Sequence, residues 1–170
     1  MTHIRDELLS DIPVIREVNS LAFERSDEAD LVDLLRQRGK LLLSLVAVEG
    51  EQVLGHIAFS RVHLIPAVPG LDGAGLAPVA VLPSRQGQGI GSELCVQGLE
   101  RCRQLHLDFA ILVGHPGYYP RFGFQPASRF GLTCKWPVPD EAFMALELRP
   151  GALQGISGMA EFEPEFDDVM

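Results

Sequence analysis

The stretch of sequence that decides the fold is GLAPVAVLPSRQGQGIGSELCVQGLERCRQLH, residues 75–106. Its pattern predicts a buried strand, a turn containing proline, a glycine-rich loop and an amphipathic helix. Gly87, Gly89 and Gly91 stand where the strand gives way to the helix. Glycine lets a ligand approach the main chain, and the first amides of a helix have no internal partner. The loop is therefore suited to bind an anion such as phosphate, although a glycine-rich connection that binds nothing has the same pattern.

Two nucleotide-binding motifs come close to this loop. A P-loop requires a lysine after its last glycine, and the loop contains no lysine. A Rossmann fingerprint fits better, with Gly87 and Gly89 before a helix and Asp108 downstream. However, five residues separate the strand from Gly87, and Asp108 precedes the next apolar run instead of closing it. An NAD-dependent oxidoreductase therefore stays only as a weaker alternative.

Two landmarks in the sequence resemble those of one enzyme family. QGQGIG, residues 86–91, is similar to the acyl-CoA-binding signature [QR]-x-x-G-x-[GA] of the GCN5-related N-acetyltransferases, the GNAT superfamily. A second family landmark is a tyrosine followed four and five residues later by Gly-Phe, which Tyr119, Gly123 and Phe124 supply. The likeness covers roughly residues 1–150, and GHPGYYPRFGF resembles most a branch of predicted bacterial acetyltransferases.

The resemblance implies a fold class and a cosubstrate. The fold is α/β, in some schemes α+β: a mixed, mostly antiparallel sheet with helices on both faces and a splay between its two central strands. Acetyl-CoA is the implied acyl donor, and no metal is expected. The pantetheine arm is expected to pair with the main chain of Val79, Ala80 and Val81 in the splay. The pyrophosphate is expected on the amides of Gln86, Gly87, Gln88, Gly89, Ile90, Gly91 and Ser92.

Hydrophobic periodicity predicts the elements around this stretch. We expect strands at 2–5, 41–48, 52–64, 76–81, 109–113 and 142–148, and one that starts at 124. We expect helices at 11–23, 27–38 and 89–106, and irregular chain at 132–139. Residues 1–154 are expected to form a single domain. Residues 155–170 contain five acidic side chains and few apolar anchors, which predicts a loosely held acidic tail.

Composition limits the partners. The chain has 170 residues and a net charge of −9, which argues against nucleic acid and modestly favours a cationic substrate. Three cysteines without paired spacing indicate reduced thiols and a cytoplasmic protein. The five histidines show no metal-ligand spacing. The N-terminus does not resemble a signal peptide, and no apolar window is long enough to cross a membrane.

Acyl transfer needs an acid for the departing thiolate and an uncharged amine. Tyr119 matches the family position whose phenol faces the sulfur of coenzyme A, so the resemblance implies a general acid, although packing is an alternative role. Tyr118 is expected only to pack. His115, at the end of a strand, is a possible base with a suitable intrinsic pKa, although a loop histidine that binds carbonyls is the commoner role. Weaker candidates for the base are His56, Glu49, Asp72 and a water relay.

These observations together favour an acyl-CoA-dependent N-acyltransferase that moves an acetyl group directly to a primary amine. A non-catalytic acyl-CoA-binding or regulatory module is the alternative from a different class. The acceptor stays open among small amines, peptide N-termini and protein lysines, with specificity expected from the first two helices and the loop at 64–75. The protein is expected to be a monomer or a homodimer.

Overall fold

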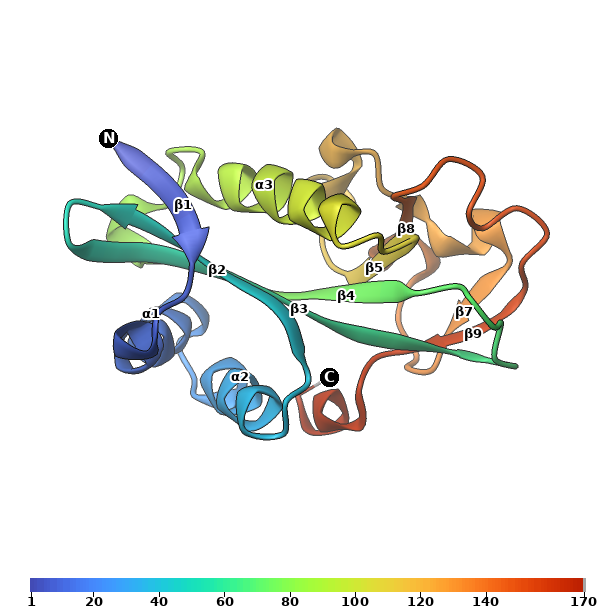
Figure 1. Ribbon diagram of the computed structural model, residues 1–170, viewed down its shortest axis with the longest axis horizontal. Coiled ribbons are helices and arrows are strands. Elements are labelled where there is room, and N and C mark those ends of the chain that lie inside the picture. The colour runs from blue at the N-terminus through green and yellow to red at the C-terminus, as the bar shows by residue number, and fades with distance from the viewer. Residues whose placement is uncertain (170) are drawn as a thin grey trace.

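The computed structural model describes residues 1–169, which form a twisted mixed sheet with helices on both faces (Figure 1). Its main path runs in the order β1-β2-β3-β4-β5-β8-β6, and only β4 and β5 are parallel along it. The strands on this path are β1 (Thr2–Asp6), β2 (Leu41–Glu49), β3 (Gln52–Ile65), β4 (Gly73–Val81), β5 (Phe109–Val113), β8 (Phe143–Glu147) and β6 (Gln125–Pro126). The predicted fold class is confirmed.

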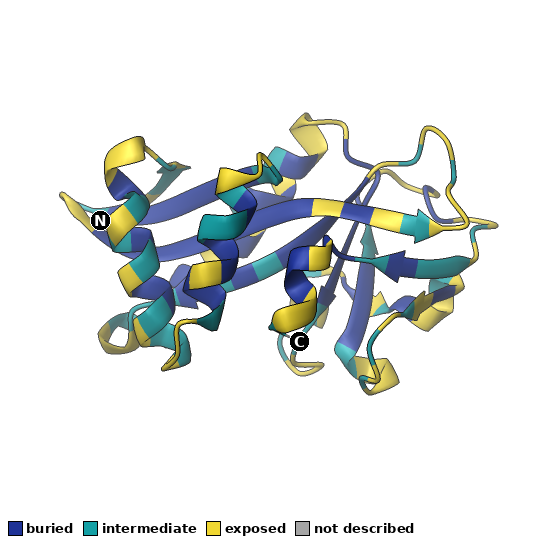
Figure 2. Cartoon of the chain, turned by 90° about the horizontal axis from the view of Figure 1, so that it is seen from below, coloured by how far each residue is buried: buried dark blue, intermediate teal, exposed yellow. Residues whose placement is uncertain are grey.

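Two helical layers cover the sheet. α1 (Ile12–Phe23) and α2 (Asp27–Gln37) lie on one face, and α3 (Ile90–Gln104) lies on the other (Figure 1). Because successive side chains of a strand point to opposite faces of the sheet, each strand packs against both helical layers. In β3, Val53 packs with Ile15 and Val32 on the α1–α2 side, whereas its neighbour Leu54 packs with Leu94 of α3. The strands are consequently buried between helices whose outer sides are exposed (Figure 2).

The hairpin and the helices follow the sequence closely. β2 and β3 are joined at Gly50, which adopts a φ of +62° in the predicted turn. α3 begins after Gly89, whose φ of +84° places it in the left-handed region that favours glycine. Each predicted helix end lies within two residues of the observed one, and Pro13, Gly39 and Gly89 mark three of the six ends in the sequence.

The central feature is the divergence of β4 from β5. The two strands pair only over Gly73–Gly75 and Phe109–Ile111. Beyond Gly75, the register of β4 against β3 shifts. The shift lies between Leu76, which pairs with Phe59, and Val79, which pairs with Ile57. The strands therefore open towards the glycine loop, which is the predicted splay.

Two predictions about the C-terminal third are wrong. The segment at 132–139, predicted to be irregular, contains β7 (Leu132–Cys134). The tail at 155–170, predicted to be loosely held, contains β9 (Gly158–Glu161), which pairs with both β3 and β7, and a 3-10 helix at Pro164–Asp168. Phe162 and Phe166 are 6% and 1% exposed, so two aromatic anchors outweigh the acidic character of this segment.

Candidate active site

The glycine loop and the start of α3 line a first cavity of about 330 Å³. No side chain caps the N-terminus of α3, and its first internal hydrogen bond runs from Glu93 N to Gly89 O at 3.0 Å. The amides of Ile90, Gly91 and Ser92 consequently have no carbonyl one turn earlier to bind. These amides and the positive end of the helix dipole favour an anion in this cavity.

One aromatic side chain, Tyr118, and one cationic side chain, Arg121, also line the first cavity. The sequence analysis did not predict that either residue lies there. Tyr118, expected only to pack, is hydrogen-bonded through its hydroxyl to Ser92 Oγ at 2.8 Å. Arg121 lies over the Tyr118 ring at 4.3 Å and donates from Nε to the Tyr118 carbonyl at 2.8 Å. Arg121 is exposed and makes no ion pair within residues 1–169, so its charge is available to an anion. The spacing of Tyr118 and Arg121 around a Pro-initiated turn was the only signal for this arrangement.

The loop itself is held by its own side chains. Arg85 donates from Nη2 to Glu49 Oε2 at 2.8 Å and from Nε to Gln88 Oε1 at 3.0 Å. Gln86 donates from Nε2 to the carbonyl of Val81 at 3.0 Å. These bonds tie the end of β4 to the glycine turn, so the amides beyond the turn keep a fixed direction.

A second cavity of about 260 Å³ lies where β4 and β5 part. β4 contributes Val79 and the end of β5 contributes Val113, while Tyr119 and His115 come from the segment after β5. Val81 and Tyr118 border the first cavity, whereas Val79 and Tyr119 border the second. The two cavities therefore follow one another along β4.

Tyr119 is fixed in this second cavity by tight packing. Its ring is edge-on to Tyr118 at 5.0 Å and to Phe124 at 6.2 Å. A Cβ on Gly114 would lie 2.5 Å from Tyr119 Cε2, so this glycine is required for the ring to approach β5. Burial raises the pKa of the Tyr119 phenol well above its usual value, with small contributions from Cys95 and Tyr118. The phenol consequently stays protonated at neutral pH and keeps its O–H group as a hydrogen-bond donor.

The candidates for a general base are placed in very different surroundings. His115 is exposed and borders the second cavity. Glu49 is bound to Arg85 beside the loop, and Asp72 lies on the surface beyond β3 with Arg61 at 3.3 Å. Neither Glu49 nor Asp72 lines the second cavity.

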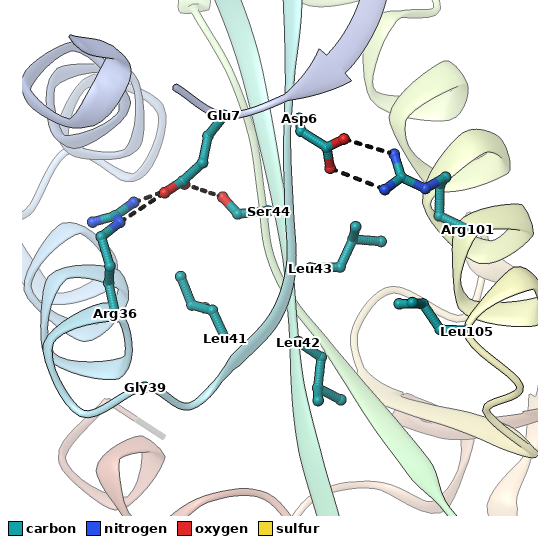
Figure 3. Close-up of a pocket in the computed structure, with 10 residues that line it drawn as sticks. All are labelled: Asp6, Glu7, Arg36, Gly39, Leu41, Leu42, Leu43, Ser44, Arg101 and Leu105. Atoms are coloured by element: carbon teal, nitrogen blue, oxygen red, sulfur yellow. Dashed lines mark hydrogen bonds and ion pairs between the residues drawn. The ribbon is translucent and has the colours of Figure 1, made fainter. Parts of the chain in front are cut away.

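His56 belongs to a buried hydrogen-bond chain, not to either cavity along β4. Its Nε2 lies 2.8 Å from Ser44 Oγ, and its Nδ1 lies 3.1 Å from Asn19 Nδ2. Ser44 in turn donates to Glu7, which Arg36 binds (Figure 3). Since the ionised Glu7 can only accept, Ser44 donates to it, and His56 Nε2 donates to Ser44. Burial lowers the pKa of His56 to about 4, so this histidine is a neutral structural group.

A further cavity lies beside the hydrogen-bond chain of His56, and the charged side chains that line it form ion pairs with one another. It measures about 370 Å³ and lies against β2, between α2 and α3 (Figure 3). Arg36 binds Glu7 at 2.9 Å, and Arg101 binds Asp6 at 3.1 Å. The charged groups of this cavity satisfy one another, and none faces the opening between β4 and β5.

Glu28 is a buried carboxylate at the second cavity that the sequence analysis missed. It lies in the first turn of α2, is 7% exposed, and is bound by Arg25 at 2.9 and 2.5 Å. The loop at 64–75, expected to set specificity, contributes no residue to the lining of this cavity among the described residues. The lining comes from α1, α2, β4, the end of β5 with the segment after it, and the C-terminal segment, so the two helices, unlike the loop, border the cavity.

The structure contradicts the alternative of a Rossmann-type dinucleotide-binding site. Asp108 accepts a hydrogen bond from the amide of Asp72 at 2.8 Å and binds Arg149 at 2.9 Å. It therefore ties two loops together at the edge of the sheet remote from Gly87. The mostly antiparallel strand order also differs from that of a dinucleotide-binding sheet.

An opened sheet with an anion-binding helix start and a buried phenol is the arrangement of an acyl-CoA-dependent transferase. Residues 3–127 match the family described as acetyltransferase (GNAT) domain. Because this match covers well over half of the sequence, the chain belongs to the GNAT acetyltransferase family. The resemblance found in the Gly loop and in Tyr119, Gly123 and Phe124 is confirmed.

Within this family the chain is similar to the N-acetyltransferase YhbS of Escherichia coli strain K12. The two are 37% identical over 165 residues, which is 96% of this chain and 98% of YhbS. The crystal structure of Escherichia coli YhbS in complex with CoA gives a TM-score of 0.91 at 36% identity, over 97% of this chain and 91% of that one. A GNAT acetyltransferase from Brucella melitensis in complex with acetyl-CoA gives a TM-score of 0.82 at 38% identity, over 98% and 99%. The branch indicated by GHPGYYPRFGF is the YhbS branch.

The described residues contain neither a membrane-spanning helix nor a metal-binding cluster. No helix is long and apolar enough to cross a membrane between residues 1 and 169. The same part of the chain holds no group of three or more His, Cys, Asp or Glu side chains that could bind a metal ion.

Proposed function

We propose that the protein transfers an acetyl group from acetyl-CoA directly to a primary amine. The observation that carries this proposal is the succession of two cavities along β4, an anion-binding one at α3 and a mostly apolar one at Tyr119. A thioester cosubstrate has the matching shape, with a diphosphate at one end and a reactive acyl group at the other. The relatives solved with CoA and with acetyl-CoA support the same assignment.

The donor is bound mainly by the main chain. The diphosphate accepts hydrogen bonds from amides between Gln86 and Ser92, and Arg121 adds a positive charge beside it. The pantetheine arm continues along Val79, Ala80 and Val81, in place of the strand pairing that β5 gives up beyond Gly75. One free amide of β4 polarises the acyl oxygen.

The reaction moves two protons. The lone pair of the uncharged amine attacks the thioester carbonyl carbon, and the C–S bond breaks as the tetrahedral adduct collapses. Tyr119 gives its phenolic proton to the departing thiolate, which leaves as free CoA. The amine nitrogen loses one proton through His115 or through water to solvent, and the Tyr119 phenolate is reprotonated from solvent. The products are the acetamide and CoA.

The test is acetyl-CoA turnover with a panel of primary amines, measured as release of free thiol, together with calorimetry of CoA binding. We expect micromolar CoA binding and turnover that requires both acetyl-CoA and an amine. A purified protein that binds neither CoA nor acetyl-CoA would exclude the proposal. Binding without turnover by any amine would instead favour a non-catalytic acyl-CoA-binding module.

The setting of the reaction follows from the cysteines. Cys95, Cys102 and Cys134 are free thiols, and the first two are buried. Free thiols are typical of a reducing compartment, so we propose that the protein acts in the cytoplasm. As a separate proposal, it acts as a monomer or a homodimer.

A further inference from the structure

The walls of the second cavity are mostly apolar. Phe23 of α1 and Leu31 of α2 face it from one side, and Phe166 and Val169 of the C-terminal segment face it from another. Its volume of about 260 Å³ lies below the usual range of small-molecule sites, which is roughly 300–1,000 Å³. The space beyond the acyl group therefore suits a compact apolar group.

Glu28 is the one carboxylate in the described lining of this cavity. Burial of a carboxylate is costly, and the positive end of α2 does not require it, because Asp27 and Asp30 in the same turn supply negative charge from outside. Arg25 occupies one hydrogen-bonding position on each Glu28 oxygen. Since an ionised carboxylate accepts about four hydrogen bonds, positions remain on Glu28 for another donor.

Three of the four carboxylates around the mouth of the cavity are already paired, and the fourth, Asp168, is exposed. An adjoining hollow of about 230 Å³ is bordered by Asp30 and Glu165, among others. Arg16 binds Asp30 at 2.7 Å, and Arg38 binds Glu165 at 2.7 Å. An acceptor with several positive charges would consequently find, beyond Glu28, only the solvent-exposed Asp168 without an ion pair among the described residues.

From these contacts we propose that the acceptor is a small monoamine with an apolar body, and that Glu28 binds its ammonium group. The apolar body lies among Phe23, Leu31 and Phe166, and the nitrogen lies between Glu28 and the opened strands. Glu28 attracts the charged amine and positions it, and the ammonium gives one proton to solvent before its neutral nitrogen attacks the thioester carbonyl carbon. This inference rests on the proposed acetyl transfer and names the acceptor class of the same site.

The first experiment uses the parent protein. Free-thiol release from acetyl-CoA is measured with 2-phenylethylamine, hexylamine, ethanolamine, spermidine and a peptide with one internal lysine. We expect kcat/KM for the first two amines to exceed the values for the other three at least tenfold. Preference for spermidine, ethanolamine or the peptide would overturn the acceptor class while leaving acetyl transfer intact. Failure to bind acetyl-CoA in calorimetry would instead remove the proposed function.

The second experiment tests Glu28 with matched variants. Glu28→Gln is expected to raise KM for 2-phenylethylamine at least tenfold, with kcat and the Kd of acetyl-CoA each within threefold of the parent. Arg25→Gln removes the ion pair but keeps the carboxylate, so KM should stay within threefold. Glu17→Gln, on the exposed side of α1, is the control for loss of one negative charge. Equal increases in KM for Glu28→Gln and Arg25→Gln would show that Glu28 only holds the helix start, and would refute its contact with the amine.

Discussion

Gly91→Ala should make the free protein slightly more stable while weakening its binding of CoA. Gly91 is the second residue of α3, and its φ is not in the left-handed region. A Cβ there would meet Tyr118 Oη at 3.5 Å and Val81 Cγ2 at 3.7 Å, which are ordinary contacts. Because alanine is the better helix former, the free energy of unfolding should rise by about 0.5 kcal/mol.

The same methyl group would enter the first cavity, which Gly91 lines beside Ser92. It would stand where a phosphate oxygen must come within about 3 Å of the helix amides. Loss of one charge-assisted hydrogen bond costs roughly 1.5–3 kcal/mol, which corresponds to a Kd for CoA about 10–150 times higher.

Substitutions of two other glycines serve as controls, because they separate the effect on stability from the effect on CoA affinity. Gly89→Ala has free space around its Cβ, but its φ of +84° costs roughly 1–2 kcal/mol of stability. Gly98→Ala would bring a Cβ within 2.7 Å of Phe59 Cε2, far from the loop, so we expect about 1–3 kcal/mol of destabilisation with unchanged CoA affinity.

The assay for all three variants combines urea unfolding without ligand and calorimetry with CoA. Only Gly91→Ala should combine equal or greater stability with weaker binding. If Gly91→Ala binds CoA within twofold of the parent, the diphosphate does not lie on the amides of α3, and the assignment of the donor site is refuted.

Three further outcomes are expected. Tyr119→Phe should lower kcat about a hundredfold with acetyl-CoA affinity unchanged, and a kcat within threefold would exclude a general acid here. Ion pairs lower the pKa of Glu165 from 4.5 to about 2, so they stabilise the fold above pH 4.5 and lose this effect towards pH 2. Glu165→Gln should therefore cost about 1–2 kcal/mol in urea unfolding at pH 7, allowing for solvent around Arg38, and nothing near pH 2. Burial raises the pKa of Cys95 and Cys102 to about 12, so mass spectrometry should find iodoacetamide on neither thiol in the folded protein.

The donor half of the site was predictable because it is local in sequence. The end of β4, the glycine turn and the start of α3 are continuous, and each has a backbone signal that glycine or proline makes visible. The divergence of β4 from β5 was predictable only through the family resemblance. The irregular pairing beyond Gly75 depends on the register of β4 against both β3 and β5, and β5 is separated from β4 by the whole of α3.

The C-terminal segment was mispredicted because its many acidic residues outnumber the two phenylalanines, Phe162 and Phe166, that hold it in the core. Phe162 and Phe166 stack at 4.9 Å, and Trp136 stacks on Phe162 at 5.3 Å. The two carboxylates between them, Glu163 and Glu165, are buried, and Lys40 binds them at 2.8 and 2.9 Å. A composition rule counts such acids as evidence of disorder, whereas their partners here come from the loop after α2, more than a hundred residues earlier.

The acceptor half of the site combines parts of the chain that no local pattern connects, yet one signal was readable. Glu28, Leu31 and Leu35 follow the i, i+3, i+7 spacing of one helix face, and all three are buried. Asp27 and Asp30 lie off this face and suffice for the dipole of α2. An acidic residue in register with the apolar face of a helix is therefore an exception that stabilising the helix does not explain. Glu28 and Phe166 come from opposite ends of the chain and line the same cavity, where Glu28 is the single carboxylate in a mostly apolar described lining.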